Sequence, residues 1–176
     1  ADIRDLTGRE AELGLLMNTL RDPGAGPVVH CLYGMPGVGK TALAVRAAHE
    51  LRDAFPDGQL YVNLRGAGPR PVTPREALGR FLRALGVNGG MIPDGLDERA
   101  EIYRARLAGR RVLVVLDDAA DEAQVEPLLP ADPGCAVLIT GRAALTALPG
   151  ARHTRVGVLD LTASIKLLAT ITGRAE

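Results

Sequence analysis

Residues 34–41 read Gly34-Met35-Pro36-Gly37-Val38-Gly39-Lys40-Thr41, and this stretch follows the pattern G-x-x-x-x-G-K-[ST] that is typical of phosphate-binding loops. Glycines let the backbone curl so that successive amides point at phosphate oxygens. A helix that starts near Gly39 directs the positive end of its dipole at the same anion. Lys40 supplies a mobile positive charge for the outer phosphates, and the Thr41 hydroxyl can ligate Mg²⁺.

The residues on either side of this loop have the patterns that such chemistry needs. The nearly continuous apolar run over residues 28–33 predicts a strand that is buried on both faces. Residues 40–52 become helical in pattern, with Leu43, Ala47 and Leu51 on one face. A glycine-rich turn that only connects a strand to a helix is the alternative. The match over the whole pattern, in this context, favours phosphate binding.

Apolar runs and helical patterns alternate along most of the remaining chain. This alternation predicts an α/β fold in which a parallel sheet is covered by helices on both faces. Strands are predicted at residues 59–64, 111–116, 136–140 and 153–156, and helices near 8–21, 74–85, 96–108, 121–129 and 162–171.

Three helix starts carry capping signals. Thr7-Gly8-Arg9-Glu10 and Thr73-Pro74-Arg75-Glu76 both fit a capping box, in which a Thr hydroxyl and a Glu carboxylate accept hydrogen bonds from amides of the first turn. Pro74 also stands at the favoured first helical position. Thr162 is expected to cap the last helix.

A pair of acids, Asp117 and Asp118, follows the apolar strand predicted at residues 111–116. Ligands of open α/β sheets bind at the carboxyl ends of the strands, so these carboxylates are expected at the ligand site. Asp117 can hold Mg²⁺ through its water shell, which makes Thr41 and Asp117 the candidate metal residues. Asp118 can orient or deprotonate an attacking water. The alternative is that the pair only caps the following short helix.

Arg142 follows another buried strand, in the segment Leu138-Ile139-Thr140-Gly141-Arg142. From the end of a strand near the phosphate-binding loop, its guanidinium could reach the terminal phosphate of a nucleotide and report whether it is present. The alternative is an ordinary surface arginine, which is common in a chain this rich in arginine.

The composition excludes several classes of protein. The chain has 176 residues and balances 21 Lys and Arg against 21 Asp and Glu, so a basic face for nucleic-acid binding is not expected. Its apolar runs are shorter than the roughly 18 residues that span a bilayer, and its N-terminus does not resemble a signal peptide. Two cysteines make no disulfide framework. We therefore expect a cytoplasmic location, with neither membrane nor direct nucleic-acid contact by this segment.

Taken together, these segments resemble the NB-ARC domain of the STAND class of signalling NTPases, and most of all the ATPase domain of AfsR-type transcriptional regulators from high-GC bacteria. The resemblance covers nearly the whole chain and depends on the order of five segments. These are Thr7-Gly8-Arg9-Glu10, residues 34–41, Tyr61-Val62-Asn63-Leu64-Arg65-Gly66, residues 113–118 and residues 138–142.

The resemblance implies a three-layer P-loop NTPase fold with a central five-stranded parallel sheet in the order 2-3-4-1-5. In that order the Thr140 strand lies between the strand before the phosphate loop and the Asp117 strand. Residues 1–158 would form the nucleotide-binding domain, and residues 159–176 the first helix of a helical subdomain. The Gly-x-Pro motif of that subdomain is not recognisable here, and Gly141 stands where the family usually has Ser or Thr.

The resemblance also implies a molecular switch that holds ADP at rest and exchanges it for ATP, with Mg²⁺, in order to oligomerise. Slow hydrolysis would reset the switch. Other domains of a full-length regulator are the implied partners, namely helical, winged-helix, DNA-binding and repeat domains. Gly8 and Arg9 would lie beside the adenine, and Arg65 and Arg142 would sense the terminal phosphate. The implied nucleotide-binding set is Gly8, Arg9, Gly34, Pro36, Gly37, Val38, Gly39, Lys40, Thr41 and Ala42; the implied catalytic set is Lys40, Asp117, Asp118 and Arg142.

Two other functions use the same loop. A metabolic kinase would need an acceptor pocket and usually a lid with arginines, for which residues 66–72 and 87–95 are the available loops. An interaction module stabilised by nucleotide would bind tightly without hydrolysis. Added acceptor that strongly stimulates turnover would favour the kinase, whereas the interaction module and a slow switch are not separated by the sequence.

Overall fold

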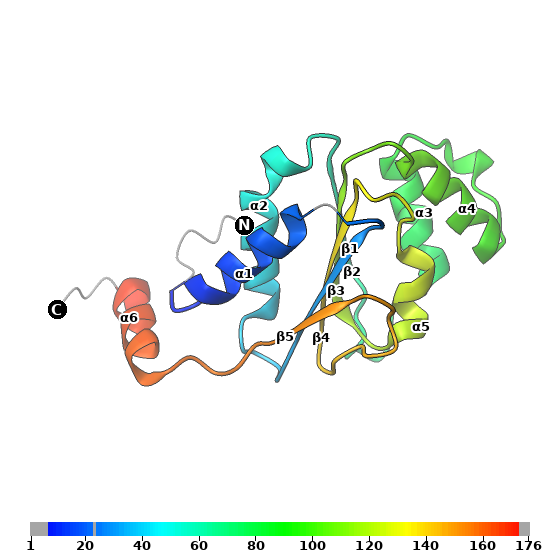
Figure 1. Cartoon of the computed structure of the whole chain (residues 1–176). Helices are drawn as coiled ribbons and strands as arrows, with labels where there is room; N and C mark the ends of the chain where they lie inside the picture. The colour runs from blue at the N-terminus through cyan, green and yellow to red at the C-terminus, as the bar shows by residue number, and fades with distance from the viewer. Residues whose placement is uncertain (1–6, 23, 173–176) are drawn as a thin grey trace.

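Five parallel strands form the centre of the molecule, in the order β2-β3-β4-β1-β5 (Figure 1). We describe residues 7–22 and 24–172 from a computed structural model. The sheet order expected from the family resemblance is confirmed. The strands are β1 (Val28–Tyr33), β2 (Gln59–Asn63), β3 (Leu113–Ala119), β4 (Ala136–Gly141) and β5 (Arg152–Arg155).

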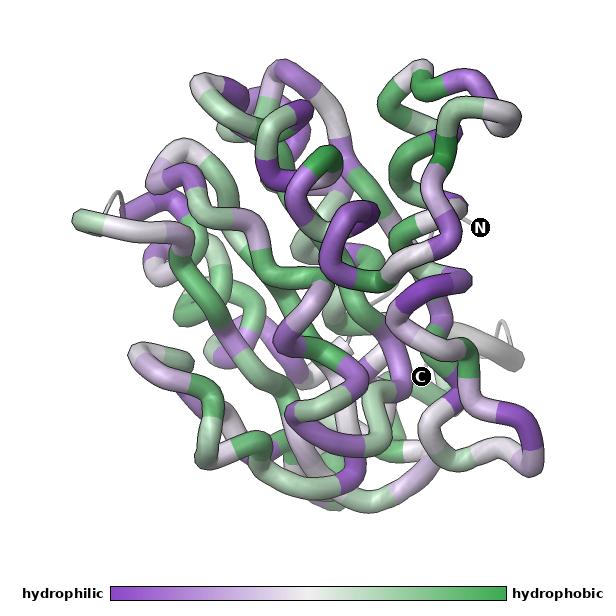
Figure 2. The backbone as a smooth tube through the Cα atoms, turned by 90° about the vertical axis from the view of Figure 1, so that its right-hand side faces the viewer, coloured by the Kyte–Doolittle hydropathy of each residue, from purple (hydrophilic) through white to green (hydrophobic). Residues whose placement is uncertain are grey.

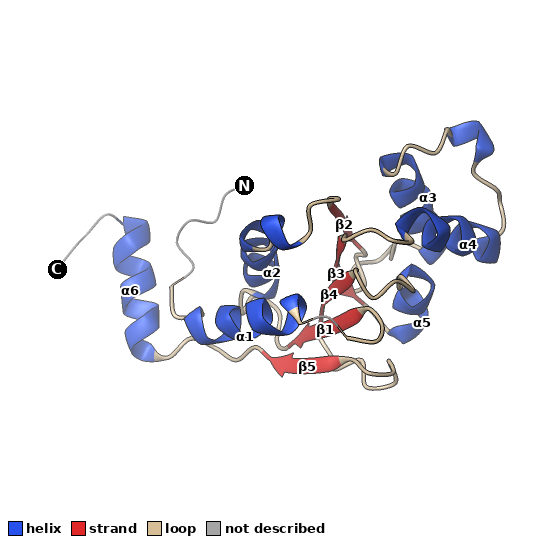
Figure 3. Cartoon of the chain, turned by 45° about the horizontal axis from the view of Figure 1, so that its top comes forward, coloured by secondary structure: helices blue, strands red, loops and turns tan. Residues whose placement is uncertain are grey.

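Helices cover both faces of this sheet, which gives the three layers expected (Figures 1 and 3). The helices α1 and α2 pack on one face, the helices α3, α4 and α5 pack on the other, and α6 stands apart from the sheet beyond α1. None of the helices in the described part of the chain has both the length and the hydrophobicity that crossing a bilayer requires. Their bounds are α1 Glu10–Arg21, α2 Lys40–Glu50, α3 Pro74–Ala84, α4 Leu96–Leu107, α5 Glu122–Val125 and α6 Leu161–Thr172, with short 3₁₀ turns at Arg52–Ala54, Gly89–Met91 and Glu126–Leu128.

The central strands bury both of their faces, because their apolar side chains alternate between two cores. In β3, Val115 packs under α1 and α2, whereas Val114 and Leu116 pack under α3, α4 and α5. Figure 2 shows hydrophobic stretches along the strands that cross the middle of the molecule. The edge strand β2 differs, because Val62 is 2% exposed while Tyr61 on its other face is 52% exposed.

The capping signals have different outcomes. The box at α3 is confirmed: the Glu76 amide donates to the Thr73 hydroxyl (3.2 Å) and the Thr73 amide donates to the Glu76 carboxylate (2.8 Å). The box at Thr7 is wrong, since Arg9 occupies the N-cap position of α1 without a side-chain cap. Glu10 is therefore the first helical residue instead of the third, and its carboxylate accepts from the Gly8 amide (3.2 Å).

The cap expected from Thr162 at the start of α6 is also wrong. This helix begins at Leu161, two residues earlier than a Thr162 cap allows. The carboxylate of Asp160 accepts a hydrogen bond from the Ala163 amide (2.7 Å), so an aspartate supplies the contact that was expected of the threonine.

The two threonines make a matched test of the α3 cap. Thr73→Ala is expected to lower the free energy of unfolding by about 1 kcal/mol, because it leaves an amide of the first turn without an acceptor. Thr7→Ala, the control, should change it by only a few tenths of a kcal/mol, the range of ordinary surface substitutions. Denaturant unfolding of both variants measures the difference, and equal losses would contradict the assignment of the caps.

Candidate nucleotide-binding site

The loop at residues 34–41 joins the end of β1 to the start of α2. Gly34 has a φ of 153°, and a Cβ at this position would lie 2.3 Å from the Val156 carbonyl oxygen, so only glycine fits. Gly39 is the N-cap of α2 with a left-handed φ of 95°, and no side chain caps this helix. The amides of the first turn of α2 therefore remain available to an anion.

The side chain of Lys40 lies across this loop. Its ammonium donates to the carbonyl oxygens of Gly34 (2.9 Å) and Met35 (2.8 Å). Burial lowers the pKa of Lys40, the carboxylate of Asp118 acts in the opposite direction, and the nearby Arg142 lowers it further. Both present acceptors are neutral, so an anionic phosphate oxygen would be a stronger partner for this ammonium.

The carboxylate of Asp117 lies at the centre of the site and is 1% exposed. Its Oδ1 accepts hydrogen bonds from the hydroxyls of Thr41 (2.7 Å) and Thr140 (2.6 Å). Its Oδ2 accepts from the Tyr61 hydroxyl (3.1 Å) and the Asn63 amide (3.0 Å). Each carboxylate oxygen thus has two donors, which fixes the plane of the carboxyl group.

These five residues meet because of sheet register. Asn63 of β2 is aligned with Asp117 of β3, and Tyr61 lies two residues earlier on the same face. The neighbouring β4 contributes Thr140, and α2 contributes Thr41. Sequence reasoning did not assign Tyr61 and Asn63 to the site. The alternating pattern of β2 places both on one face, but only the order of the strands shows that this face adjoins Asp117.

A β-bulge brings Asp118 to the same side of the sheet. In a regular strand Asp118 would face away from Asp117. The register between β3 and β4 shifts between Leu116 and Ala119, and Asp118 has a left-handed φ of 52°. Both carboxylates consequently line one cavity. The strand predicted to end at residue 116 runs on to Ala119, because the pairing with β4 resumes after the bulge.

An open cavity of about 480 Å³ connects these groups. Among the described residues no cluster of three or more His, Cys, Asp or Glu side chains could hold a metal ion. Mg²⁺ usually takes one or two protein oxygens together with waters and phosphates. Thr41 and Asp117 supply such hard oxygen ligands beside the loop. The cavity is lined by Pro36, Gly37, Gly39, Lys40, Thr41, Ala42, Asn63, Ala67, Asp117, Asp118, Thr140 and Arg142.

The two arginines considered as phosphate sensors occupy different places. Arg142 is exposed, lines this cavity and also lines a second cavity of about 680 Å³ that shares residues of the loop. Arg65 is exposed and is not among the residues that line the first cavity. A Cβ on the neighbouring Gly141 would lie 3.3 Å from the Ala119 carbonyl oxygen, so this position has little room for the Ser or Thr usual in the family.

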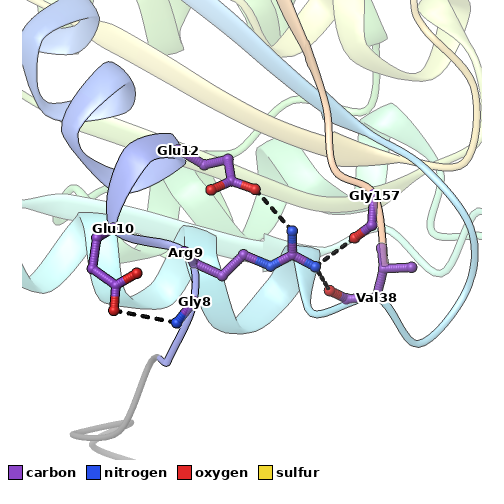
Figure 4. A network of polar contacts seen from close by, with 6 residues as sticks. All are labelled: Gly8, Arg9, Glu10, Glu12, Val38 and Gly157. Carbon is purple, nitrogen blue, oxygen red and sulfur yellow. Dashed lines mark hydrogen bonds and ion pairs between the residues drawn. The ribbon is translucent and has the colours of Figure 1, made fainter. Parts of the chain in front are cut away.

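Arg9 connects three segments that are far apart in the sequence (Figure 4). Its guanidinium, in a residue only 5% exposed, donates to the Glu12 carboxylate (2.8 Å), to the Val38 carbonyl of the phosphate loop (2.9 Å) and to the Gly157 carbonyl after β5. These contacts make Arg9 a brace of the loop. A direct contact of Gly8 or Arg9 with adenine stays a prediction.

Comparison with known proteins agrees with this geometry. The model of the NB-ARC domain matches residues 9–175. The chain belongs to the NB-ARC family. It is 48% identical to the regulatory protein AfsR of Streptomyces griseus and 49% identical to AfsR of Streptomyces coelicolor, in each case over 98% of this chain. The chain spans only 18% of the length of each AfsR protein. A probable disease resistance protein of Arabidopsis thaliana, RPP1, is 24% identical over 79% of the chain and 12% of its own length.

Solved structures share the fold of this NB-ARC domain. The ORC1 protein of Aeropyrum pernix, solved in complex with DNA, gives a TM-score of 0.67 at 21% identity, over 96% of this chain and 50% of that one. A STAND protein of Pyrococcus horikoshii with a tetratricopeptide repeat sensor gives 0.60 at 19% identity, over 100% of this chain and 27% of that one. The P-loop fold and the family expected from the sequence are therefore confirmed.

Proposed function

We propose that this NB-ARC domain is a nucleotide-dependent switch that binds ATP or ADP with Mg²⁺ and hydrolyses ATP slowly. The observation that carries the proposal is that the uncapped start of α2, Lys40 and Asp117 all line one open cavity. The first two provide positive charge for phosphates, and the third provides a place for the metal.

Phosphates would bind by replacing contacts that the loop now makes with itself. The Lys40 ammonium would exchange two loop carbonyls for phosphate oxygens, and the amides of the first α2 turn would donate to the same anion. Thr41 and Ala42, which belong to the expected nucleotide-binding residues, also line this cavity. The preference for adenine is proposed from the likeness to the NB-ARC family alone.

Hydrolysis would be divided between the two acids. Thr41 and Asp117 would hold Mg²⁺, which when bound neutralises charge that develops on the phosphates. Asp118 would orient the attacking water, since its carboxylate lines the cavity and also accepts from the Ala67 amide (3.3 Å). Arg142 would sense the terminal phosphate from the rim. Such a site supports a weak Mg²⁺-dependent ATPase, because no closing lid is needed for a slow reset.

The nucleotide state would be passed on through α6. Residues 1–158 would be the nucleotide-binding domain, and residues 159–176 the first helix of a helical subdomain. A Cβ on Gly8 would lie 2.5 Å from the Ala163 Cβ, so the segment before α1 lies directly against α6. Leu161, Ile165 and Leu168 are 77%, 50% and 61% exposed and recur at helical spacing, as expected where further helices pack.

The rest of a larger regulator would receive the signal. The AfsR proteins that it matches are much longer chains. The domain would likewise be one part of a longer regulator, with the helical, winged-helix, DNA-binding and repeat domains that the family resemblance implies. ATP binding would favour homo-oligomers and ADP the closed resting state. This segment would act in the cytoplasm, without contacting nucleic acid or membrane itself.

Identification of the bound nucleotide tests the proposal. The purified domain is incubated with Mg²⁺ and ATP, freed of excess ligand by gel filtration and denatured, and the released nucleotide is separated by chromatography. We expect ADP, with ATP at short incubation times. Release of no nucleotide, or only of guanine nucleotide after a mixed incubation, would contradict the proposal. Turnover that rises strongly with an added small acceptor would instead indicate a kinase.

A further inference from the structure

The acceptor sites of Asp117 are fully occupied by protein donors. An ionised carboxylate has about four lone-pair sites, and here Oδ1 and Oδ2 each accept two hydrogen bonds. A metal that is held through its water shell needs a lone pair on this carboxylate, because the waters donate to it. At least one of the four protein donors must therefore give way when Mg²⁺ binds.

The two donors on Oδ1 are compatible with the metal. A hydroxyl that donates its hydrogen still has oxygen lone pairs, so Thr41 can hold Mg²⁺ and keep its bond to Asp117. Thr140 is 1% exposed and its hydroxyl also accepts from the Asp118 amide (2.9 Å), which fixes it from both sides. The site for an incoming water is therefore on Oδ2.

Of the two donors on Oδ2, Tyr61 is the one free to leave. The Asn63 side chain is held at both ends, because its Oδ1 accepts from the Arg65 amide (2.9 Å) while its amide donates to Asp117. Tyr61 stands on the edge strand β2 and is 52% exposed, so its ring can turn toward solvent. Its hydrogen bond to Oδ2, at 3.1 Å, is also the longest of the four bonds to the Asp117 carboxylate.

We propose that the Tyr61 hydroxyl takes the place of a Mg²⁺-bound water on Oδ2 of Asp117, and that binding of Mg²⁺ with nucleotide displaces it. This inference rests on the proposed function and adds a specific role to a residue outside the phosphate loop. Tyr61 is a positioning residue: it keeps the carboxylate oriented in the metal-free state and competes with the metal. Displacement of Tyr61 would change the exposed surface of the edge strand β2 whenever the metal binds.

Removal of the hydroxyl tests the competition. The dissociation constant of ADP is measured by calorimetry with excess EDTA and with excess Mg²⁺. The constant in EDTA divided by the constant in Mg²⁺ gives the gain in affinity that the metal provides. Tyr61→Phe is expected to raise this ratio about fivefold, as expected for one net hydrogen bond of about 1 kcal/mol removed from the competing state. Tyr33→Phe, the matched control, should leave the ratio unchanged.

Tyrosine fluorescence gives a readout that does not depend on affinity or turnover. The chain has three tyrosines and no tryptophan. A hydrogen bond to a carboxylate quenches tyrosine emission, so adding Mg²⁺ to the ADP complex should increase the emission. The increase should persist in Tyr33→Phe and disappear in Tyr61→Phe.

The outcomes separate the two proposals. If the Tyr61→Phe ratio is unchanged or smaller, or if its emission still rises with Mg²⁺, the competition is refuted while nucleotide binding stands. If the wild-type domain binds no nucleotide in either condition, the proposed function is refuted and the inference falls with it.

Discussion

Replacement of Lys40 by alanine is expected to abolish measurable nucleotide binding while leaving the fold intact. The Lys40 ammonium bonds two carbonyl oxygens of the phosphate loop, and with nucleotide it would make two charge-assisted bonds to phosphates instead. Hydrogen bonds to charged groups contribute about 1.5–3 kcal/mol each, so the loss should exceed about 100-fold in affinity. Calorimetry with ADP and Mg²⁺ measures it.

Two further variants control this experiment. Lys166→Ala removes the only other lysine of the chain, in α6, and should leave affinity unchanged. Lys40→Arg keeps the charge but replaces a compact ammonium with a planar fork, so it should restore binding only in part. Circular dichroism and denaturant unfolding report whether Lys40→Ala stays folded. A folded Lys40→Ala variant with wild-type affinity would overturn the assignment of residues 34–41 as the phosphate-binding loop.

Replacement of Asp118 by asparagine is expected to slow ATP hydrolysis about 100-fold, the lower range for loss of a general base. Affinity for ATP should change less than about threefold, because the Asp118 carboxylate is hydrogen-bonded to the Ala67 amide (3.3 Å) and acts on Lys40 of the loop only through its charge. Asparagine is preferred to alanine because it tolerates the left-handed backbone at this position. Single-turnover hydrolysis and calorimetry are the two measurements.

The control for Asp118 is Asp53→Asn, which removes an exposed carboxylate from the turn after α2 and should affect neither quantity. Equal losses of binding and hydrolysis in Asp118→Asn would remove its role with water and leave a structural one. A wild-type rate of hydrolysis in Asp118→Asn would mean that another group at the cavity orients the attacking water.

The phosphate loop could be predicted from sequence because its information is local. Its pattern lies within residues 34–41, and the strand before it and the helix after it follow from apolar periodicity. The family and the sheet order could be predicted because the same local signals recur in a fixed order. The capping box at Thr73 succeeded for the same reason, since Pro74 and Glu76 complete it within four residues.

Features that depend on pairing between distant strands could not be predicted. The role of Tyr61 follows from a register with β3, more than 50 residues away. The bulge that turns Asp118 toward the cavity arises from the pairing of β3 with β4 and leaves no mark in the local pattern. The Thr7 box failed because tertiary contacts hold Arg9 at the N-cap position, and such contacts outweigh a local capping preference.

The brace made by Arg9 sets a practical boundary for anyone who shortens this domain. A version trimmed to start at α1 proper would lose the guanidinium and leave the Val38 and Gly157 carbonyls without their donor. The truncation would therefore disturb the phosphate loop at Val38, which lies far along the chain from the new terminus. Shortened versions of this domain and of its relatives should therefore keep the residue before the helix. A version that begins at the first helical residue is expected to remain soluble but to lose nucleotide binding.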